Sequence, residues 1–273
     1  MEKRLLCAFA HPDDESFGPS GTIAQIVADP GARVRLVIAT RGEAGTIGIS
    51  KRYEPGELAR IRQGEMIEAA RRLGAELFFL GYPDRRVSLV PPEMIVTDLI
   101  REIRLFRPQA LLTFHPNGIS AHPDHLAMTA ALRAAFDVAA DPGQCPECGP
   151  PWRSDRLFYH ALTPRQAGAI AHSRAVETIP EEEVDLALDV LDWLPRKHAA
   201  CLAHGTQLDF YNRLQAATGG LDAFWATEHH VLGAWRGAKP AGLAGLFDGL
   251  GEGQALTSSR SAPAPAGPRP PRG

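Results

Sequence analysis

Short apolar runs alternate along the chain with longer segments whose apolar residues recur at helical spacing. The runs expected to form strands cover residues 5–10, 34–40, 77–80 and 110–114, and the expected helices cover residues 21–28, 57–73, 92–106 and 122–140. The strands lack an alternation of apolar and polar residues, which favours burial on both faces. The pattern therefore predicts an α/β fold with a mostly parallel, Rossmann-like sheet flanked by helices.

The second half of the chain continues this pattern less regularly. Strands are expected at residues 156–162 and 184–190 and a helix at 195–204, after a loop rich in Pro, Gly and Cys at 141–152. The C-terminal end is dominated by Ser, Ala, Pro, Arg and Gly, a composition that cannot bury a core. We expect a single domain over residues 1–250 and a disordered tail over residues 251–273.

Composition and charge narrow the classes of partner. The 273 residues include 29 basic and 32 acidic side chains, and the net charge of -3 leaves no electrostatic footprint for nucleic acid or an anionic membrane. No apolar run is long enough to span a bilayer, and four cysteines are too few for a secreted disulfide framework. We expect a cytoplasmic protein that binds a small molecule, and homo-oligomerisation stays open.

Two clusters of imidazoles and carboxylates each follow an apolar strand. The first is His-Pro-Asp-Asp-Glu at residues 11–15, and the second is His-Pro-Asp-His at residues 122–125. In a parallel sheet, ligands bind outside the carboxyl ends of the strands, where both clusters fall. One such cluster alone could be a capped turn, but two at two strand ends predict a metal site.

The residue types in these clusters suit a catalytic metal ion. Zinc at a catalytic site typically takes three His or carboxylate ligands and leaves one position for water. His11, Asp14 and His125 can supply this set. Zinc is favoured, although other divalent transition metals fit the same donors.

The remaining polar residues of the clusters suit proton transfer. Asp13 is free to act as general base toward a metal-bound water and then as general acid. His122 could face the same site and stabilise an oxyanion, with Asp124 available to orient an imidazole. This combination predicts hydrolytic chemistry.

The two motifs resemble those of the LmbE-like, or PIG-L, deacetylases. This family carries His-Pro-Asp-Asp-Glu after the first strand and His-Pro-Asp-His after a later one, and both stand unaltered here. The similarity extends over most of residues 5–230. Secondary matches are Thr40-Arg41-Gly42-Glu43-Ala44-Gly45, Arg62 with Glu65, Tyr82-Pro83-Asp84, Lys197, His204 and Gln207.

The resemblance implies zinc-dependent removal of an N-acetyl group from a glucosamine unit, on a Rossmann-like sheet without a dinucleotide. It gives the two motifs the roles described above and adds Arg62 and Asp84 as contacts to sugar hydroxyls or a linked group. The sequence around the first motif is most similar to the branch that deacetylates N-acetylglucosaminyl malate in bacillithiol synthesis. Mycothiol-type deacetylases, chitooligosaccharide deacetylases and thiol-conjugate amidases share the core motifs and remain alternatives.

An alternative of another class is a non-catalytic or nucleotide-binding Rossmann-like module. The glycines at positions 18 and 21 follow the first strand, as phosphate-binding glycines do. They lack the Gly-x-Gly-x-x-Gly spacing, and Thr40-Arg41 occupies the place of the acidic residue that binds ribose. The sequence therefore favours the hydrolase.

For most of the other cysteines and histidines, the sequence does not require a role in the site. Cys145 and Cys148 form half of a zinc-ribbon pattern, and a flexible loop with solvent-facing thiols is favoured over a metal site. His204 could contact the ligand or bond carbonyls at a helix end. His229 and His230 are expected to form a solvated pair.

Overall fold

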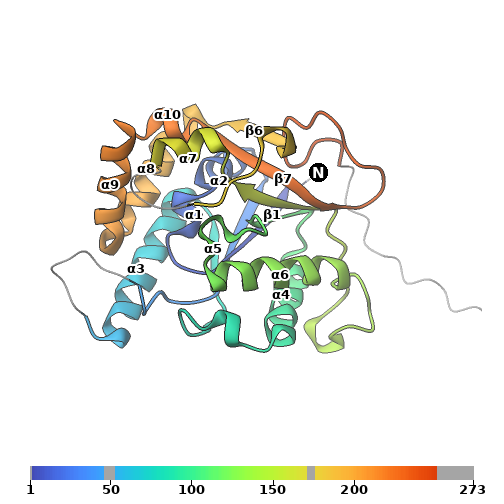
Figure 1. Cartoon of the computed structure of the whole chain (residues 1–273). Coiled ribbons are helices and arrows are strands. Elements are labelled where there is room, and N and C mark those ends of the chain that lie inside the picture. Colours follow the sequence, from blue (N-terminus) through green and yellow to red (C-terminus); the bar gives the residue numbers. More distant parts are fainter. Residues whose placement is uncertain (1, 46–52, 171–175, 251–273) are drawn as a thin grey trace, which may run out of the picture.

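The computed structural model describes residues 2–45, 53–170 and 176–250 of the chain, so the predicted tail at 251–273 lies outside the described residues. One seven-stranded sheet runs through the molecule in the order β3-β2-β1-β4-β5-β7-β6 (Figure 1). Its strands are β1 Arg4–Phe9, β2 Arg33–Ile38, β3 Glu76–Phe79, β4 Ala110–Phe114, β5 Arg156–Ala161, β6 Leu186–Asp189 and β7 Thr227–Trp235.

The first five strands in this order pair in parallel, whereas β7 is antiparallel to both β5 and β6. Residues 5–9 of β1 are fully buried, and all of β4 is buried as well. This burial on both faces explains why neither strand alternates apolar with polar residues. The predicted α/β fold with a mostly parallel sheet is confirmed.

Helices cover both faces of the sheet. Helices α4 and α6 pack against each other and against β1 on one face, and α2, α3 and α8 pack together on the other face (Figure 1). The helices are α1 Asp14–Phe17, α2 Ser20–Val27, α3 Pro55–Leu73, α4 Pro92–Phe106, α5 Gly118–Ala121, α6 Pro123–Val138, α7 Pro164–Ile170, α8 Leu194–Ala203, α9 Leu208–Thr218 and α10 Asp222–Trp225. Among the described residues, no helix combines the length and apolar character that spanning a bilayer requires.

Strand β7 corrects the prediction for the C-terminal histidines. Its residues are buried in strict alternation, so His230 is fully buried while the neighbouring His229 is half-buried. His230 Nε2 lies 2.9 Å from the hydroxyl of Thr22, and His229 Nδ1 lies 2.9 Å from Gln166 Oε1. The expected solvated pair is therefore wrong, because successive side chains of a strand point to opposite faces.

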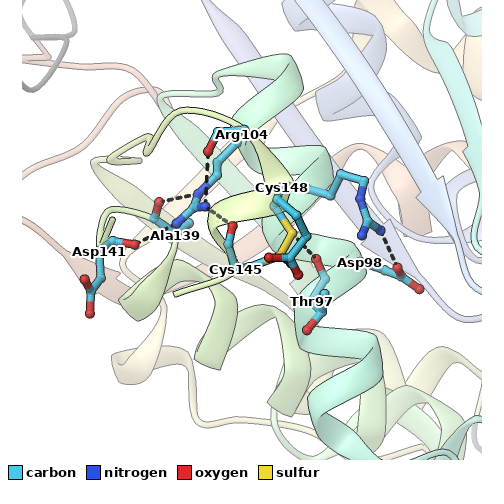
Figure 2. Close-up of a disulfide and its surroundings, with 10 residues drawn as sticks. Thr97, Asp98, Arg104, Ala139, Asp141, Cys145 and Cys148 are labelled. Carbon is cyan, nitrogen blue, oxygen red and sulfur yellow. Dashed lines mark hydrogen bonds and ion pairs between the residues drawn. A yellow bond between two sulfur atoms is a disulfide. The ribbon is translucent and has the colours of Figure 1, made fainter. Parts of the chain in front are cut away.

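The loop after α6 corrects the prediction for the two neighbouring cysteines. Cys145 and Cys148 are joined in a disulfide, and Cys148 is buried (Figure 2). The side chain of Arg104 donates hydrogen bonds to the carbonyls of Ala139, Asp141 and Cys145, which fixes the loop to α4. The expected loop with solvent-facing thiols is therefore wrong.

Candidate metal and catalytic site

Two neighbouring strands place the His-Pro-Asp clusters at one edge of the sheet. His11 follows the end of β1, and α1 begins at Asp14. Strand β4, the parallel neighbour of β1, ends at Phe114, and its connection leads through α5 to His122, the N-cap of α6. Because the carboxyl ends of parallel strands share an edge, the two clusters meet as the sequence predicts.

The side chains of the three predicted metal ligands form a compact triangle, in which each oxygen of Asp14 faces a different imidazole. His11 Nδ1 lies 3.3 Å from His125 Nε2 and 3.5 Å from Asp14 Oδ2, and Asp14 Oδ1 lies 3.3 Å from His125 Nε2. Ligands about 2.1 Å from a tetrahedral metal ion are separated from one another by roughly 3.4 Å. The separations between these side chains are therefore close to those between the ligands of a tetrahedral site.

Two other groupings of His and Asp could also hold a metal ion. One replaces Asp14 with His122, and the other combines His11 with Asp84 and Asp124; in each, the ligand atoms lie within 4.8 Å of one another. We favour the predicted set because its separations of 3.3–3.5 Å match tetrahedral geometry and because Asp14 and His125 line the adjacent cavity. His122, Asp84 and Asp124 then lie in the layer around the ligands.

Buried carboxylates surround the imidazole of His11. Its Nε2 lies 3.1 Å from Asp84 Oδ1 and 3.5 Å from Asp124 Oδ2, and both acids are buried. Burial alone would lower the pKa of His11, but hydrogen bonds to Asp124, Asp14 and Asp84 outweigh it and raise the pKa to about 12. This concentration of negative charge favours a cation at the site.

The second imidazole, His125, is also held on its outer side. Its Nδ1 lies 2.9 Å from the carbonyl oxygen of Gly118, and its ring stacks on Phe114 with 4.0 Å between centroids. Metal-binding histidines characteristically use their second nitrogen in this way, which fixes the tautomer and the ring orientation. The backbone therefore presents Nε2 of His125 to the triangle.

Asp13 lies beside the triangle in an unusual backbone conformation. Its φ of 107° is in the left-handed region, and its amide donates to Glu15 Oε2 at 3.1 Å. Burial raises the pKa of Asp13 to about 6, with Arg62 opposing and Asp14 reinforcing the shift. Its carboxylate thus exchanges a proton closer to neutrality than an ordinary aspartate does.

His122 also lies against the triangle. Its ring centroid is 4.8 Å from that of His11, and its Nδ1 accepts a hydrogen bond from the amide of Asp124 at 3.2 Å. Burial lowers the pKa of His122, and the neighbouring imidazoles His11 and His125 lower it further. The proton of the neutral ring is therefore on Nε2.

Arg62 and Asp84, the predicted contacts to the sugar, both have partners within the protein. Arg62 is buried, donates to the carbonyls of Pro12 and Gly42, and lies 3.1 Å from Asp13 Oδ2. Asp84 is turned toward His11 and accepts from the amide of Ala44 at 2.9 Å. Neither side chain lines the cavity beside the triangle; Arg62 contacts Asp13, and Asp84 contacts His11. Their contacts to a sugar stay a prediction.

His204 also has an internal partner. Its Nε2 lies 2.9 Å from Glu15 Oε1, and both side chains are fully buried. Since Glu15 in turn accepts the amide of Asp13, this pair supports the backbone of the first motif. Neither predicted alternative, a ligand contact or a cap of helix carbonyls, describes this position.

A cavity of about 560 Å³ adjoins the triangle. Asp13, Asp14 and His125 line one part of it, and aromatic side chains form much of the remaining wall. Further lining residues are Phe17, His160, Lys197, Phe210, Trp225 and Glu228. The cavity is within the size range of small-molecule sites. Sequence reasoning missed His160 because a single histidine within a strand has no informative spacing.

Replacing Asp84 with Asn should weaken metal binding about 10–100-fold, because an amide holds the His11 ring less firmly than a carboxylate. Competition with a chromophoric chelator would measure the affinity. Asp29→Asn is the matched control, since Asp29 pairs with Lys3 at the surface. Equal metal affinity in both variants would show that Asp84 does not support the ligand.

Comparison with known proteins identifies the class to which this fold and site belong. Residues 6–136 match the family described as PIG-L: GlcNAc-PI de-N-acetylase. A relative from Saccharopolyspora erythraea, 1D-myo-inositol 2-acetamido-2-deoxy-alpha-D-glucopyranoside deacetylase 2, is 33% identical over 249 residues, which cover 82% of this chain and 90% of the relative. The chain belongs to the PIG-L family of deacetylases, which are amide hydrolases.

Solved structures share the fold. The N,N'-diacetylchitobiose deacetylase of Pyrococcus horikoshii aligns with a TM-score of 0.65 at 22% identity, covering 84% of this chain and 83% of that one. GalB, the 4-carboxy-2-hydroxymuconate hydratase of Pseudomonas putida KT2440, aligns with the same TM-score at 19% identity, covering 88% and 100%. The same fold thus serves a deacetylase and a hydratase.

The relatives correct the expected branch of the family. Further relatives at 29–31% identity are also named as deacetylases of the inositol-linked sugar. They favour the mycothiol-type alternative over the malate branch of bacillithiol synthesis. The malate interpretation rested on residues near the first motif, which the branches share.

Proposed function

We propose that the chain is a metal-dependent N-deacetylase of a small N-acetylglucosamine conjugate, with His11, Asp14 and His125 as the metal ligands. The observation that carries this proposal is the triangle of His11, Asp14 and His125, which adjoins a cavity of suitable size. The chain is also a member of a deacetylase family. Zinc is the metal favoured by two imidazoles and one carboxylate.

Asp13 moves the protons in the proposed reaction. A divalent ion held by the triangle would polarise the acetyl carbonyl and increase the acidity of a water molecule. The Asp13 carboxylate takes a proton from the attacking water and later returns it to the nitrogen of the leaving amine. Arg62, 3.1 Å from Asp13 Oδ2, keeps this carboxylate in place.

His122 stabilises the negative charge that develops on the carbonyl oxygen. Its Nδ1 accepts from the amide of Asp124, so Nε2 is the nitrogen left to donate. Asp124 therefore has two supporting functions: its amide fixes His122, and its carboxylate lies 3.5 Å from Nε2 of His11. A donor aimed at a developing oxyanion is a major source of rate enhancement in amide hydrolysis.

We infer that the conjugate is N-acetylglucosamine linked to inositol. Support comes from the relatives, which are named for this substrate and align over most of this chain. The malate and oligosaccharide conjugates and the thiol-conjugate amides are competing substrates for the same chemistry.

An acetate-release assay on purified protein tests the proposal. N-acetylglucosamine conjugates of inositol, malate and a second sugar are compared at equal concentration, together with a thiol-conjugate amide. We expect the inositol conjugate to have the highest kcat/KM. Preference for another conjugate would overturn the inositol assignment, and an absence of acetate release from all of the sugars would overturn the deacetylase itself.

A further inference from the structure

The cavity contains a polar region that the proposed chemistry does not use. His160 on β5 and Lys197 on α8 both line the cavity, and both side chains are nearly fully buried. Gly18 connects Lys197 to the first motif: its amide donates to the carbonyl of Asp14, one helical turn earlier, and its own carbonyl accepts from Lys197 Nζ. A pair that lines the same cavity as Asp14 is well placed to meet the body of a substrate.

The imidazole of His160 lacks the partner that a buried ring normally has. Its Nδ1 is enclosed and accepts or donates no hydrogen bond within the described residues. A Cβ atom at Gly18, which also lines the cavity, would lie 3.4 Å from Cδ2 and 3.7 Å from Nε2 of the ring, so the edge that carries Nε2 faces Gly18. Burying an imidazole costs free energy unless a partner compensates it, so the Nε2 edge is suited to a ligand with its own hydrogen-bonding groups.

Lys197 is held in place but retains donor capacity. Its ammonium donates to the Gly18 carbonyl and to Glu228 Oε1, the latter at 2.6 Å, and it has three protons. Glu228 is already satisfied by the amide of Gly21 and by the amide and hydroxyl of Thr22. Lys197 itself uses two of its three protons, so the third can be donated to a group in the cavity.

Aromatic rings line the cavity together with His160 and Lys197. Lys197 Nζ lies 5.0 Å from the centroid of Trp225, and the ring of Phe17 lies 6.4 Å from that of Trp225 and 4.8 Å from that of Phe210. A saturated ring with hydroxyl groups matches this arrangement. Its C–H face can pack on the aromatic rings while hydroxyls at its edge meet nitrogen atoms.

We propose that His160 and Lys197 form the subsite that recognises hydroxyl groups on the ring of the substrate. The inference rests on the proposed function, and it adds two residues to the sugar contacts that the resemblance implies for Arg62 and Asp84. A hydroxyl both donates and accepts, so it suits Nε2 of His160 in either tautomer as well as the Lys197 ammonium. The ligand class is therefore a polyhydroxylated ring.

The test compares His160→Leu with wild type, using glucosamine and cyclohexylamine as binding probes of similar ring size. Titration calorimetry gives a Kd for each probe without requiring turnover. We expect His160→Leu to raise the Kd of glucosamine about tenfold through the lost hydrogen bond and to leave that of cyclohexylamine unchanged. His160→Gln, which keeps a polar group, should recover part of the loss.

His198→Leu serves as the matched control, because it makes the same substitution at a histidine beside Lys197 on α8. His198 bonds Tyr211 and Asp222, and none of these three residues lines the cavity. Melting temperature and metal content verify that each variant is folded and loaded. An unchanged glucosamine Kd in His160→Leu would overturn the subsite, as would an equal loss for both probes. Failure of the wild type to release acetate would overturn the deacetylase alone, since the binding comparison does not depend on turnover.

Discussion

Replacing Asp13 with Asn should lower kcat by about 10²–10⁴-fold while the bound metal is retained. The amide cannot take a proton from the attacking water, but it preserves the size of the side chain beside Arg62. The side chains of the triangle belong to other residues, so their separations need not change. Acetate release and metal content, measured on the same preparation, give the two quantities.

Asp29→Asn is again the control, because it makes the same chemical change at a surface ion pair. Activity of Asp13→Asn close to that of wild type, with metal retained, would remove Asp13 from the role of proton carrier. Loss of metal in this variant would place Asp13 among the ligands.

Replacing Asp14 with Ala should abolish activity by a different cause, the loss of the metal. We expect its metal affinity to fall by more than about 100-fold, which exceeds the usual effect of a residue that only supports a ligand. Asp14 Oδ2 also accepts from the amide of His11 at 2.7 Å, so the alanine loosens the turn as well. Asp14→Asn keeps an oxygen for that amide and separates the two effects.

The contrast between these neighbouring aspartates is the informative outcome. Chelator competition should give near wild-type affinity for Asp13→Asn and a severe loss for both Asp14 variants. Retention of metal by Asp14→Asn and Asp14→Ala would contradict the ligand assignment. Such a result would favour the alternative grouping in which His122 joins His11 and His125.

The sequence predicts the parallel half of the fold well because each element there has a clear boundary. Helix α4 and strand β4 occupy the predicted residues 92–106 and 110–114, where prolines precede the helix and separate it from the strand. Strand β7 was not predicted because it begins with the polar residues Thr-Glu-His-His. Polar residues at its buried positions remove the apolar pattern by which a strand is recognised. Their burial depends on partners such as Thr22, which is distant in the sequence.

The site also has a part that local sequence motifs predict and a part that depends on contacts between distant segments. The proximity of His11, Asp14 and His125 could be foreseen because these residues lie in two short motifs at the ends of strands, and strand order places those ends together. The positions of Arg62 and Asp84 could not be foreseen, because their contacts join distant segments of the chain. Arg62 contacts Gly42, 20 residues away, and Asp84 contacts His11, 73 residues away. His160 and Lys197 come together only in the tertiary structure, where Lys197 bonds the Gly18 carbonyl and Glu228 on β7, the strand beside β5.

The fold by itself leaves the reaction undecided. The hydratase GalB has the same TM-score to this chain as the chitobiose deacetylase, and at these identities both comparisons describe architecture alone. Function therefore has to be argued from the site. Here the triangle, the adjacent Asp13 and the similarity to a 33% identical deacetylase support the proposed function.

Stepwise addition of Zn²⁺ to metal-depleted protein, with acetate release measured at each step, tests the central claim most directly. We predict that the depleted protein is inactive and that activity rises with bound metal to a plateau at about one ion per chain. Asp14→Ala should remain inactive at the same Zn²⁺ concentrations. Full activity in the depleted wild-type protein would contradict a catalytic metal at His11, Asp14 and His125.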